Sequence, residues 1–496
     1  MTFDLPQSKT NTNRQKHIIT SSHKVSSLTR IIRDYGSWDA VYGETDECEE
    51  KGRTVPVVQS VVKSREEGLG LTAATAASAA QAGATAPQDT PSVDTIGANA
   101  PAIEPLAPRP DGSGAWAAAE PLTAAELERG FACCLAQIDA NMSLFGEDYP
   151  TPATRGNRYG VMDNSEWTNG FWTGQLWLAY ERTGEARYRS LAEKNVESFL
   201  DRVERRFELD HHDLGFLYVP SCVAAYRLAG SERARTAALL AADQLLTRWR
   251  ERGAFLQAWG PMDSREHYRL IIDCLLNVPL LYWAADETGD AGYADKARRH
   301  FETTCANIIR PDGSAFHTFY MDPETGAPGH GATRQGYSDD SAWARGQAWG
   351  ICGIPLNIRH TGLTDYFPYA VSMRNYFLNR LPKDDVCYWD LVFGEGSDQS
   401  RDSSAAAIAA CGLDEMARLA CCPAAEADVC RGAEAAILRS LIENYTARYH
   451  EPGEPILYHG VYSWHSGKGV DEGNVWGDYF FLEALTRAAG TWDPYW

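Results

Sequence analysis

The sequence predicts an all-α fold, an (α/α)6 barrel in which six helical hairpins close into a ring, preceded by a disordered extension. About twelve helical segments follow residue 116, and no strand-like alternation of useful length competes with them. Apolar segments alternate with charged amphipathic ones about six times, which is typical of inner and outer helices in repeated hairpins. The first 115 residues differ in composition from the rest, and so indicate a separate segment.

Residues 1–115 form the predicted extension. They contain the acidic run ETDECEE and the low-complexity run LTAATAASAAQAGATAPQ, with few large apolar side chains. Such a composition cannot bury enough apolar surface to fold. We therefore expect disorder over residues 1–115, apart from a short helix near Val57–Glu67, and one catalytic barrel domain over residues 116–496.

The helices of the barrel begin after Thr123, which is an N-cap candidate because Glu126 three positions later completes a capping box. Each later helix is expected where apolar residues recur with helical spacing. These helices are Gly170–Arg182, Arg187–Arg205, Leu214–Leu228, Glu232–Glu251, Ile271–Ala285, Tyr293–Ile309, Ser341–Arg359, Asp365–Leu381, Ser403–Leu419, Ala427–Tyr449 and Trp476–Ala489.

The turns between helices support a ring of hairpins. Four apolar helices end in a small residue and a glycine that supplies the left-handed C-cap conformation, at Gly184, Gly230, Gly289 and Gly362. Three apolar segments contain a proline at which a helix starts or kinks, namely Pro220, Pro279 and Pro355. The pocket is expected at the end where loops lead into the inner helices. An open solenoid is the alternative, but its repeats would be more regular in length.

Composition restricts partners and location. The net charge of −21 argues against a generic nucleic-acid binder and against anionic membranes. The 12 cysteines are scattered without zinc-binding spacing, which suits free thiols in a reducing compartment. No apolar run is long enough to span a bilayer, and the first residues lack the apolar core of a secretory signal. We expect a cytoplasmic monomer without membrane or nucleic-acid partners. A transit peptide ending near Arg33 is the alternative.

Two carboxylates carry the expected chemistry. Asp273 lies inside the apolar run IIDCLLNVPLLYWA, and burial there would raise its pKa toward values useful for a general acid. It could instead cap a turn or pair with Arg269. Asp213 ends the triplet His211-His212-Asp213 before an apolar helix, where it is also a good N-cap. A metal site at this triplet is not favoured, because consecutive side chains seldom converge on one ion.

Aromatic and basic residues surround these carboxylates in the expected pocket. Trp167 and Trp259 precede apolar segments and are suited to stack on sugar rings, although tight core packing explains them equally well. Arg345, flanked by Trp343 and Trp349, could bind a carboxylate through two hydrogen bonds or form an internal ion pair. The loop YHGVYSWHSGKG could hold an anion, or be an ordinary solvated loop.

Together these segments resemble glycoside hydrolase family 88, the unsaturated glucuronyl hydrolases. The resemblance runs in order from about residue 123 to residue 496 and rests on EWTNGFWTGQLWLAYE, LDHHDLGFLYVPS, LQAWGP, IIDCLLNVPLLYWA, FHTFY, TRQGYSDDSAWARGQAWGI, YWD, RDSSAAAI and GNVWGDYFFLEAL. It implies a single (α/α)6 barrel. It also implies release of a C4=C5 unsaturated glucuronic acid from lyase-generated glycosaminoglycan-type oligosaccharides, by hydration of the vinyl ether and without metal or cofactor.

The resemblance also assigns roles to residues. Asp273 matches the general acid and base, and Asp213 matches the second essential carboxylate. The residues that match sugar-contacting positions are Trp167, His212, Trp259, His317, Gln335, Trp343 and Arg345. Residues similar to those that accept sulfated sugars are Arg334, Ser463, Ser466 and Lys468.

Three other functions compete with this interpretation. An unsaturated rhamnogalacturonyl hydrolase would share the fold and the chemistry but act on pectic fragments. A non-catalytic sugar-binding protein should lack one of the two carboxylates, whereas Asp213 and Asp273 are both present. A terpenoid-type enzyme would need more metal-binding acidic segments than Asp339-Asp340 provides.

Overall fold

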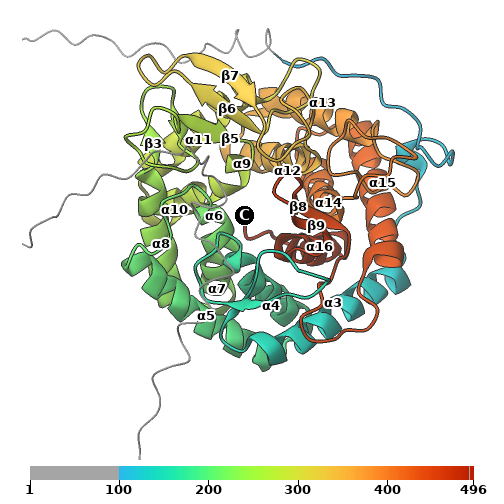
Figure 1. The fold of residues 1–496 in the computed structure, drawn as a ribbon, viewed down its shortest axis with the longest axis horizontal. Helices are drawn as coiled ribbons and strands as arrows, with labels where there is room; N and C mark the ends of the chain where they lie inside the picture. The colour runs from blue at the N-terminus through green and yellow to red at the C-terminus, as the bar shows by residue number, and fades with distance from the viewer. Residues whose placement is uncertain (1–99, 491) are drawn as a thin grey trace, which may run out of the picture. The chain divides into compact units, whose positions relative to one another are not determined.

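The computed structural model describes residues 100–490 and 492–496, in which helices surround a common centre (Figure 1). Six inner units line the ring within these residues: α4 (Asn169–Thr183), α6 (Leu214–Tyr218) with the π-helical turn η2 (Val219–Val223) and α7 (Ala224–Ala229), α9 (Cys274–Asn277) with α10 (Pro279–Thr288), α12 (Ala344–Thr361), α14 (Ser403–Arg418) and α16 (Val475–Ala488). Each inner unit contacts the next, and α16 contacts α4, so the inner layer is closed. The predicted six-hairpin barrel is therefore confirmed.

The outer layer contains the amphipathic helices. In the described chain these are α3 (Ala124–Phe145), α5 (Ala186–Glu204), α8 (Glu232–Leu246), α11 (Ala291–Ile308), α13 (Phe367–Leu378) and α15 (Ala424–Ser440). The outer helix α5 buries one face only, whereas α12 is buried along nearly its whole length. This difference follows the sequence pattern, because a helix that is apolar all round has to lie inside. Shorter helical turns are η1 (Trp116–Ala118), η3 (Thr364–Tyr366) and η4 (Leu441–Tyr445).

Short antiparallel strands form in the loops between the helices. They form the pairs β1 (Tyr149–Pro150) with β2 (Val161–Met162), β3 (Trp249–Arg250) with β4 (Phe255–Leu256) and β8 (Gly460–Ser463) with β9 (Lys468–Glu472), and a sheet of β5 (Arg269–Ile271), β6 (Thr318–Met321) and β7 (Pro328–Ala332). The sequence did not predict these strands, since segments of two to five residues are too short to show alternation.

Several predicted helix signals are confirmed. Thr123 and Glu126 form the expected capping box at the start of α3. The four predicted glycine C-caps all adopt left-handed backbone angles, with φ of 70° at Gly184, 65° at Gly230, 75° at Gly289 and 72° at Gly362. The prolines behave differently from one another: Pro279 begins α10, Pro220 lies in η2, and Pro355 lies inside α12.

One expected helix has the wrong start. Residues 269–271 form β5 rather than the beginning of a helix, and α9 starts only at Cys274. An apolar run without a polar face does not distinguish a buried strand from a buried helix, and pairing with β6 decides for the strand. Asp273 consequently lies at a strand-to-helix junction and not within a helix. The predicted helix 232–251 is similarly too long, because residues 249–250 belong to β3.

The end of the predicted extension is ordered. Residues 100–115 run along the barrel, where Asn375 donates to the Glu104 carbonyl at 2.9 Å and Arg109 pairs with Asp385 at 2.7 Å. These residues therefore belong to the folded unit, since polar contacts with α13 and with the loop after it hold them in place. The remaining predictions for the extension, including the helix near Val57–Glu67, lie outside the described residues.

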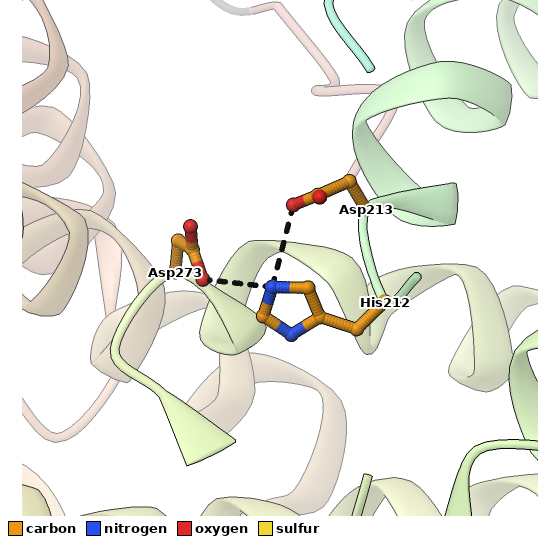
Figure 2. A group of neighbouring side chains, drawn as sticks. All are labelled: His212, Asp213 and Asp273. Atoms are coloured by element: carbon orange, nitrogen blue, oxygen red, sulfur yellow. Dashed lines mark ion pairs between the residues drawn. The ribbon is translucent and has the colours of Figure 1, made fainter. Parts of the chain in front are cut away.

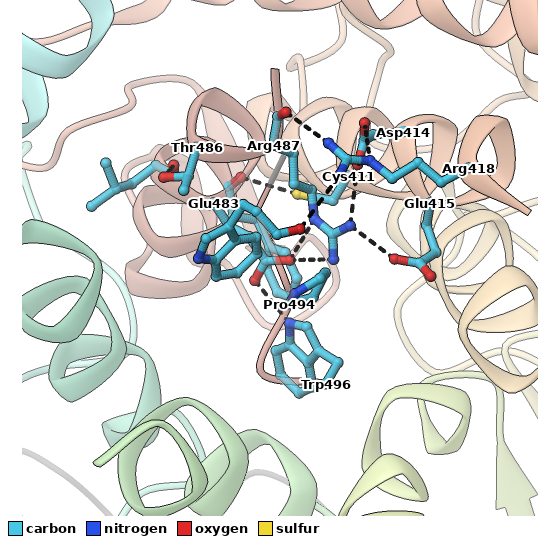
Figure 3. Close-up of polar contacts among 12 residues, drawn as sticks. Cys411, Asp414, Glu415, Arg418, Glu483, Thr486, Arg487, Pro494 and Trp496 are labelled. Carbon is cyan, nitrogen blue, oxygen red and sulfur yellow. Dashed lines mark hydrogen bonds and ion pairs between the residues drawn. The ribbon is translucent and has the colours of Figure 1, made fainter. Parts of the chain in front are cut away.

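A buried charge cluster joins the C-terminal ends of α14 and α16 (Figure 3). Arg487 is fully buried and pairs with Glu483 at 2.8 Å and with Glu415 at 2.9 Å. Residue 496 lies near the centre of the ring (Figure 1), where the Trp496 indole donates to Glu483 at 2.8 Å and packs against Phe480. These contacts fill the ring at this end. Within the described residues, no helix combines the length and apolarity that crossing a bilayer requires.

Candidate active site

Four of the residues predicted for the site lie where loops enter the inner helices. Trp167 comes just before α4, Asp213 before α6, Asp273 before α9 and Trp343 before α12. Because the inner helices alternate regularly with outer ones, these four starting points share one end of the ring. Residues separated by more than a hundred positions thereby contribute to one site.

The two carboxylates occupy N-cap positions but do not cap. Asp213 precedes α6 and Asp273 precedes α9, and neither side chain accepts a hydrogen bond from its own helix. Both instead approach His212, whose Nε2 lies 3.4 Å from Asp213 Oδ1 and 3.2 Å from Asp273 Oδ1 (Figure 2). His211 supports the far side of Asp213, with Nδ1 3.2 Å from Oδ2. The expected N-cap position of Asp213 is therefore confirmed, but its side chain serves the site.

The environment separates the two carboxylates electrostatically. Burial raises the pKa of Asp273 above its ordinary value, although His212 opposes this effect. Burial also acts on Asp213, but there the charges of His212 and His211 outweigh it and lower the pKa. Burial disfavours the charged form of His212, yet the two carboxylates together raise its pKa. Paired groups with opposite pKa shifts are typical of acid–base catalysis.

The same three side chains form a group that could hold a metal ion, since their ligand atoms lie within 4.8 Å of one another. Their arrangement favours a shared proton instead. Nε2 of His212 faces both carboxylates, which places it to share a proton with either of them, and the two carboxylates raise the pKa of His212. A metal ion would have to compete with a proton for this nitrogen, because metals bind the neutral imidazole. The site therefore fits acid–base chemistry better than metal chemistry.

Asn277 is a site residue that sequence reasoning missed. It is fully buried, its Oδ1 accepts the Phe216 N–H at 2.9 Å, and its Nδ2 donates to the Asp273 carbonyl at 3.2 Å. Gly215 allows this approach, because a Cβ there would lie 2.3 Å from Asn277 Cα. The only signal in the sequence was a polar residue within the apolar run that contains Asp273.

His317 brings another loop to the site. Its carbonyl accepts the Ile272 N–H at 3.1 Å, next to Asp273, and its Nδ1 accepts the Arg334 N–H at 2.9 Å and that of Gln335 at 3.3 Å. Burial lowers the pKa of His317 to about 3, and nearby cations contribute. Since Nδ1 accepts hydrogen bonds, the neutral ring carries its proton on Nε2 and can only donate there.

Arg345 is committed to internal partners, which favours the second of the two predicted roles. One terminal nitrogen lies 3.2 Å from Asp402 and also donates to the Val461 carbonyl. The other donates to Gln335 at 2.6 Å and to the Tyr462 carbonyl at 2.8 Å. The charge still lowers the pKa of Asp273, so Arg345 acts on the site through its field as well as through packing.

The aromatic residues predicted for the site each pack against another ring or a cation. Trp167 is half-buried, donates to the Tyr462 hydroxyl at 3.0 Å and stacks on Trp476 at 5.3 Å. The ring centres of Trp343 and His317 lie 4.5 Å apart. The Arg269 guanidinium lies 4.1 Å from the centre of the Trp259 ring. Tyr462 and Trp476 were not predicted as site residues, although the sequence analysis singled out the two segments in which they lie.

The predicted anion loop is the β8–β9 hairpin. Ser463 and Lys468 are partners in its register, and Ser466 is exposed at the tip. Lys468 Nζ lies 4.4 Å from the centre of the Tyr462 ring. Burial lowers the pKa of Lys468, whereas the charge of Glu166 raises it. Tyr462 thus connects the hairpin to Trp167 and Arg345. The Arg334 guanidinium lies 6.0 Å from the centre of the Trp259 ring.

Comparison with known proteins agrees with this geometry. Residues 148–450 match the model of the protein family described as Glycosyl Hydrolase Family 88. The chain belongs to glycosyl hydrolase family 88. A family 88 relative, the unsaturated chondroitin disaccharide hydrolase of Streptococcus pneumoniae, is 58% identical over 375 residues, covering 76% of this chain and 95% of the relative.

Solved structures of this family extend the likeness to three dimensions. The crystal structure of unsaturated glucuronyl hydrolase from Streptococcus agalactiae matches with a TM-score of 0.76 and 52% identity, over 80% of this chain and 100% of that one. An aspartate-to-asparagine mutant of unsaturated glucuronyl hydrolase from the same organism, complexed with dGlcA-GalNAc6S, matches with a TM-score of 0.70 and 49% identity, over 79% and 100%. The predicted family resemblance is therefore confirmed.

Proposed function

We propose that this protein releases C4=C5 unsaturated glucuronic acid from the non-reducing end of lyase-generated glycosaminoglycan oligosaccharides. The observation that carries this proposal is the pair of carboxylates of half-buried Asp273 and buried Asp213, which share His212 and have opposite pKa shifts. Membership of family 88 and the names of the relatives, which are unsaturated chondroitin disaccharide and glucuronyl hydrolases, support the same reaction.

The reaction is a hydration of the vinyl ether. Protonated Asp273 transfers its proton to C4, and positive charge develops at C5 and the ring oxygen. Asp273, now ionised, removes a proton from a water molecule while that water adds to C5. The resulting hemiketal opens, and the glycosidic bond then breaks without further catalysis. The raised pKa of Asp273 suits the first step, because a carboxyl must hold its proton near neutral pH to act as an acid.

Asp213 and His212 act on the pKa of Asp273 in opposite directions, since the charge of Asp213 raises it and His212 lowers it. Ionised Asp213 stabilises the positive charge on His212, and His212 in turn contacts Asp273 at 3.2 Å. Asp213 is also suited to hold sugar hydroxyls, because an ionised carboxylate only accepts hydrogen bonds. Trp167 and Trp259 provide flat faces for the sugars, while His317 and Gln335 supply polar contacts. Arg334 supplies positive charge near the acidic substrate.

We further propose that the substrate is sulfated. Ser463, Ser466 and Lys468 lie on one hairpin, where a hydroxyl pair and an ammonium together suit a sulfate group. The Streptococcus agalactiae relative was crystallised with dGlcA-GalNAc6S, a sulfated disaccharide, which supports this choice. Arg334 is the fourth residue proposed for this site.

The test is the loss of ultraviolet absorbance, because hydration destroys the conjugated double bond. Wild-type protein should consume an unsaturated chondroitin disaccharide, and Asp273→Asn should not. Asp478→Asn removes another buried carboxyl, on α16, and serves as the matched control that keeps activity. Activity on an unsaturated rhamnogalacturonyl disaccharide alone would instead identify a pectic enzyme. Binding without consumption of either compound would identify a sugar-binding protein.

The enzyme is proposed to work as a cytoplasmic monomer. The described cysteines are all free thiols and most are buried, which favours a reducing compartment. The net charge of −21 argues against anionic membranes and nucleic acids as partners.

A further inference from the structure

An N-cap side chain normally accepts a hydrogen bond from the third residue of its helix. This protein follows that rule at four helices, where the N-cap side chain accepts the N–H three positions later: Thr123 from Glu126, Ser231 from Ala234, Asp402 from Ala405 and Asn474 from Gly477. Asp213 is the N-cap of α6 and should accept the Phe216 N–H in the same way. Its side chain makes no such bond.

Another side chain takes this hydrogen bond. Asn277 Oδ1 accepts the Phe216 N–H at 2.9 Å, from the last residue of α9. The opposite end of the same amide donates to the Asp273 carbonyl at 3.2 Å. One buried amide therefore connects the third residue of α6 with the residue that precedes α9. The close approach at Gly215 holds the two segments in register.

We propose that Asn277 is a positioning residue that caps α6 in place of Asp213 and thereby leaves the Asp213 carboxylate facing His212. Two acceptors compete for one donor, so removal of Asn277 leaves the Phe216 N–H unsatisfied in a buried position. Asp213 is the nearest residue by sequence that can satisfy it, and rotation toward its own helix breaks the contacts with His211 and His212. An unsatisfied buried N–H is costly enough to drive that rotation.

The side chain of Asn277 also acts on Asp213 directly. A hydrogen bond from Asn277 lowers the pKa of Asp213, after the larger effects of burial, His212 and His211. Asn277 thus keeps Asp213 ionised as well as oriented. Because the inference rests on the proposed function, its test must separate a failure of positioning from a failure of the reaction.

The experiment is a double-mutant cycle in the ultraviolet assay with Asn277→Ala and Asp213→Asn. In the wild-type background, Asp213→Asn should lower kcat/KM by about a hundredfold or more. In the Asn277→Ala background, the same substitution should cost less than about tenfold, because Asp213 has already left the site. The low-pH limb of the kcat/KM profile should also shift in Asn277→Ala, since Asp213 has exchanged its charged partners.

Asn357→Ala is the matched control. Asn357 is equally buried, accepts from the Tyr282 hydroxyl at 3.0 Å and donates to the Leu275 carbonyl at 2.9 Å, but contacts neither carboxylate among the described residues. In its background the Asp213→Asn effect and the low-pH limb should both stay unchanged. If Asn277→Ala fails to fold, Asn277→Ser is used in the same cycle, because its hydroxyl is too short to reach Phe216.

The outcomes separate the two hypotheses. An Asp213→Asn effect of equal size in the wild-type and Asn277 variant backgrounds overturns the inference while leaving the reaction intact. A small Asp213→Asn effect in the wild-type background overturns it too, because Asp213 would then need no positioning. Absence of activity in the wild type contradicts the proposed function itself.

Discussion

Arg345 offers the sharpest test of whether a buried arginine at the site supports the fold or binds the substrate. The family resemblance implies a sugar contact, whereas the structure directs the guanidinium to Asp402, Gln335 and two carbonyls of β8. Arg345→Met keeps most of the side-chain volume and removes all four hydrogen bonds. The main expected consequence is therefore a loss of stability.

The magnitude follows from the state of Asp402. Its side chain is fully buried, and removing one partner of a buried ion pair typically costs about 3–5 kcal/mol. Asp402 keeps the Ser404 hydroxyl at 2.5 Å and the Ala405 N–H at 3.4 Å as donors. The lower end of that range, about 3 kcal/mol, is therefore expected. Such a loss is a large fraction of the stability of an ordinary domain.

The assay compares urea unfolding with kinetics at a temperature where the variant is folded. Arg374→Met is the control, since Arg374 is equally buried and pairs with Glu426 far from the carboxylates along the chain. Both variants should lose stability, and both should keep KM within about threefold, which is less than 1 kcal/mol. Only Arg345→Met should shift the high-pH limb of the kcat/KM profile to higher pH, because Arg345 lowers the pKa of Asp273. Wild-type stability with KM raised more than about tenfold would refute the reasoning.

Three further variants test other parts of the molecule. Lys468→Ala should raise KM for the 6-sulfated disaccharide about tenfold, the effect of losing about 1.4 kcal/mol, and leave the unsulfated one nearly unchanged; equal loss on both would contradict the sulfate site. Burial raises the pKa of Asp478 from 3.8 to about 7, so the folded state holds this proton longer and stability falls as pH rises between those values. Asp478→Asn should flatten that fall in denaturant unfolding, and an unchanged slope would refute it. Gly215→Ala should reduce kcat and stability together, because its Cβ would lie 2.3 Å from Asn277 Cα; wild-type kinetics would show that α6 and α9 can separate freely.

Sequence patterns predicted some parts of the helical ring correctly and others incorrectly. Helix ends were predictable where a local signal exists, as at Thr123 and the C-cap glycines, because capping depends on neighbours along the chain. The start of α9 was wrong, because pairing of β5 with β6 joins segments almost fifty residues apart. The ordered residues 100–115 were missed for the same reason, since their partners lie far along the chain, on α13 and in the loop after it.

The sequence by itself determined the alternation of inner and outer helices, the family, and the two aspartates on which the proposed chemistry depends. These features depend on local periodicity and on residue type, both of which can be read along one dimension. Only the tertiary structure decided that His212 lies between Asp213 and Asp273, that Arg345 faces Asp402, and that Asn277 caps a helix sixty residues away. Those relations depend on which loops meet at one end of the ring, and a closed ring brings together residues whose separation in sequence carries no such information.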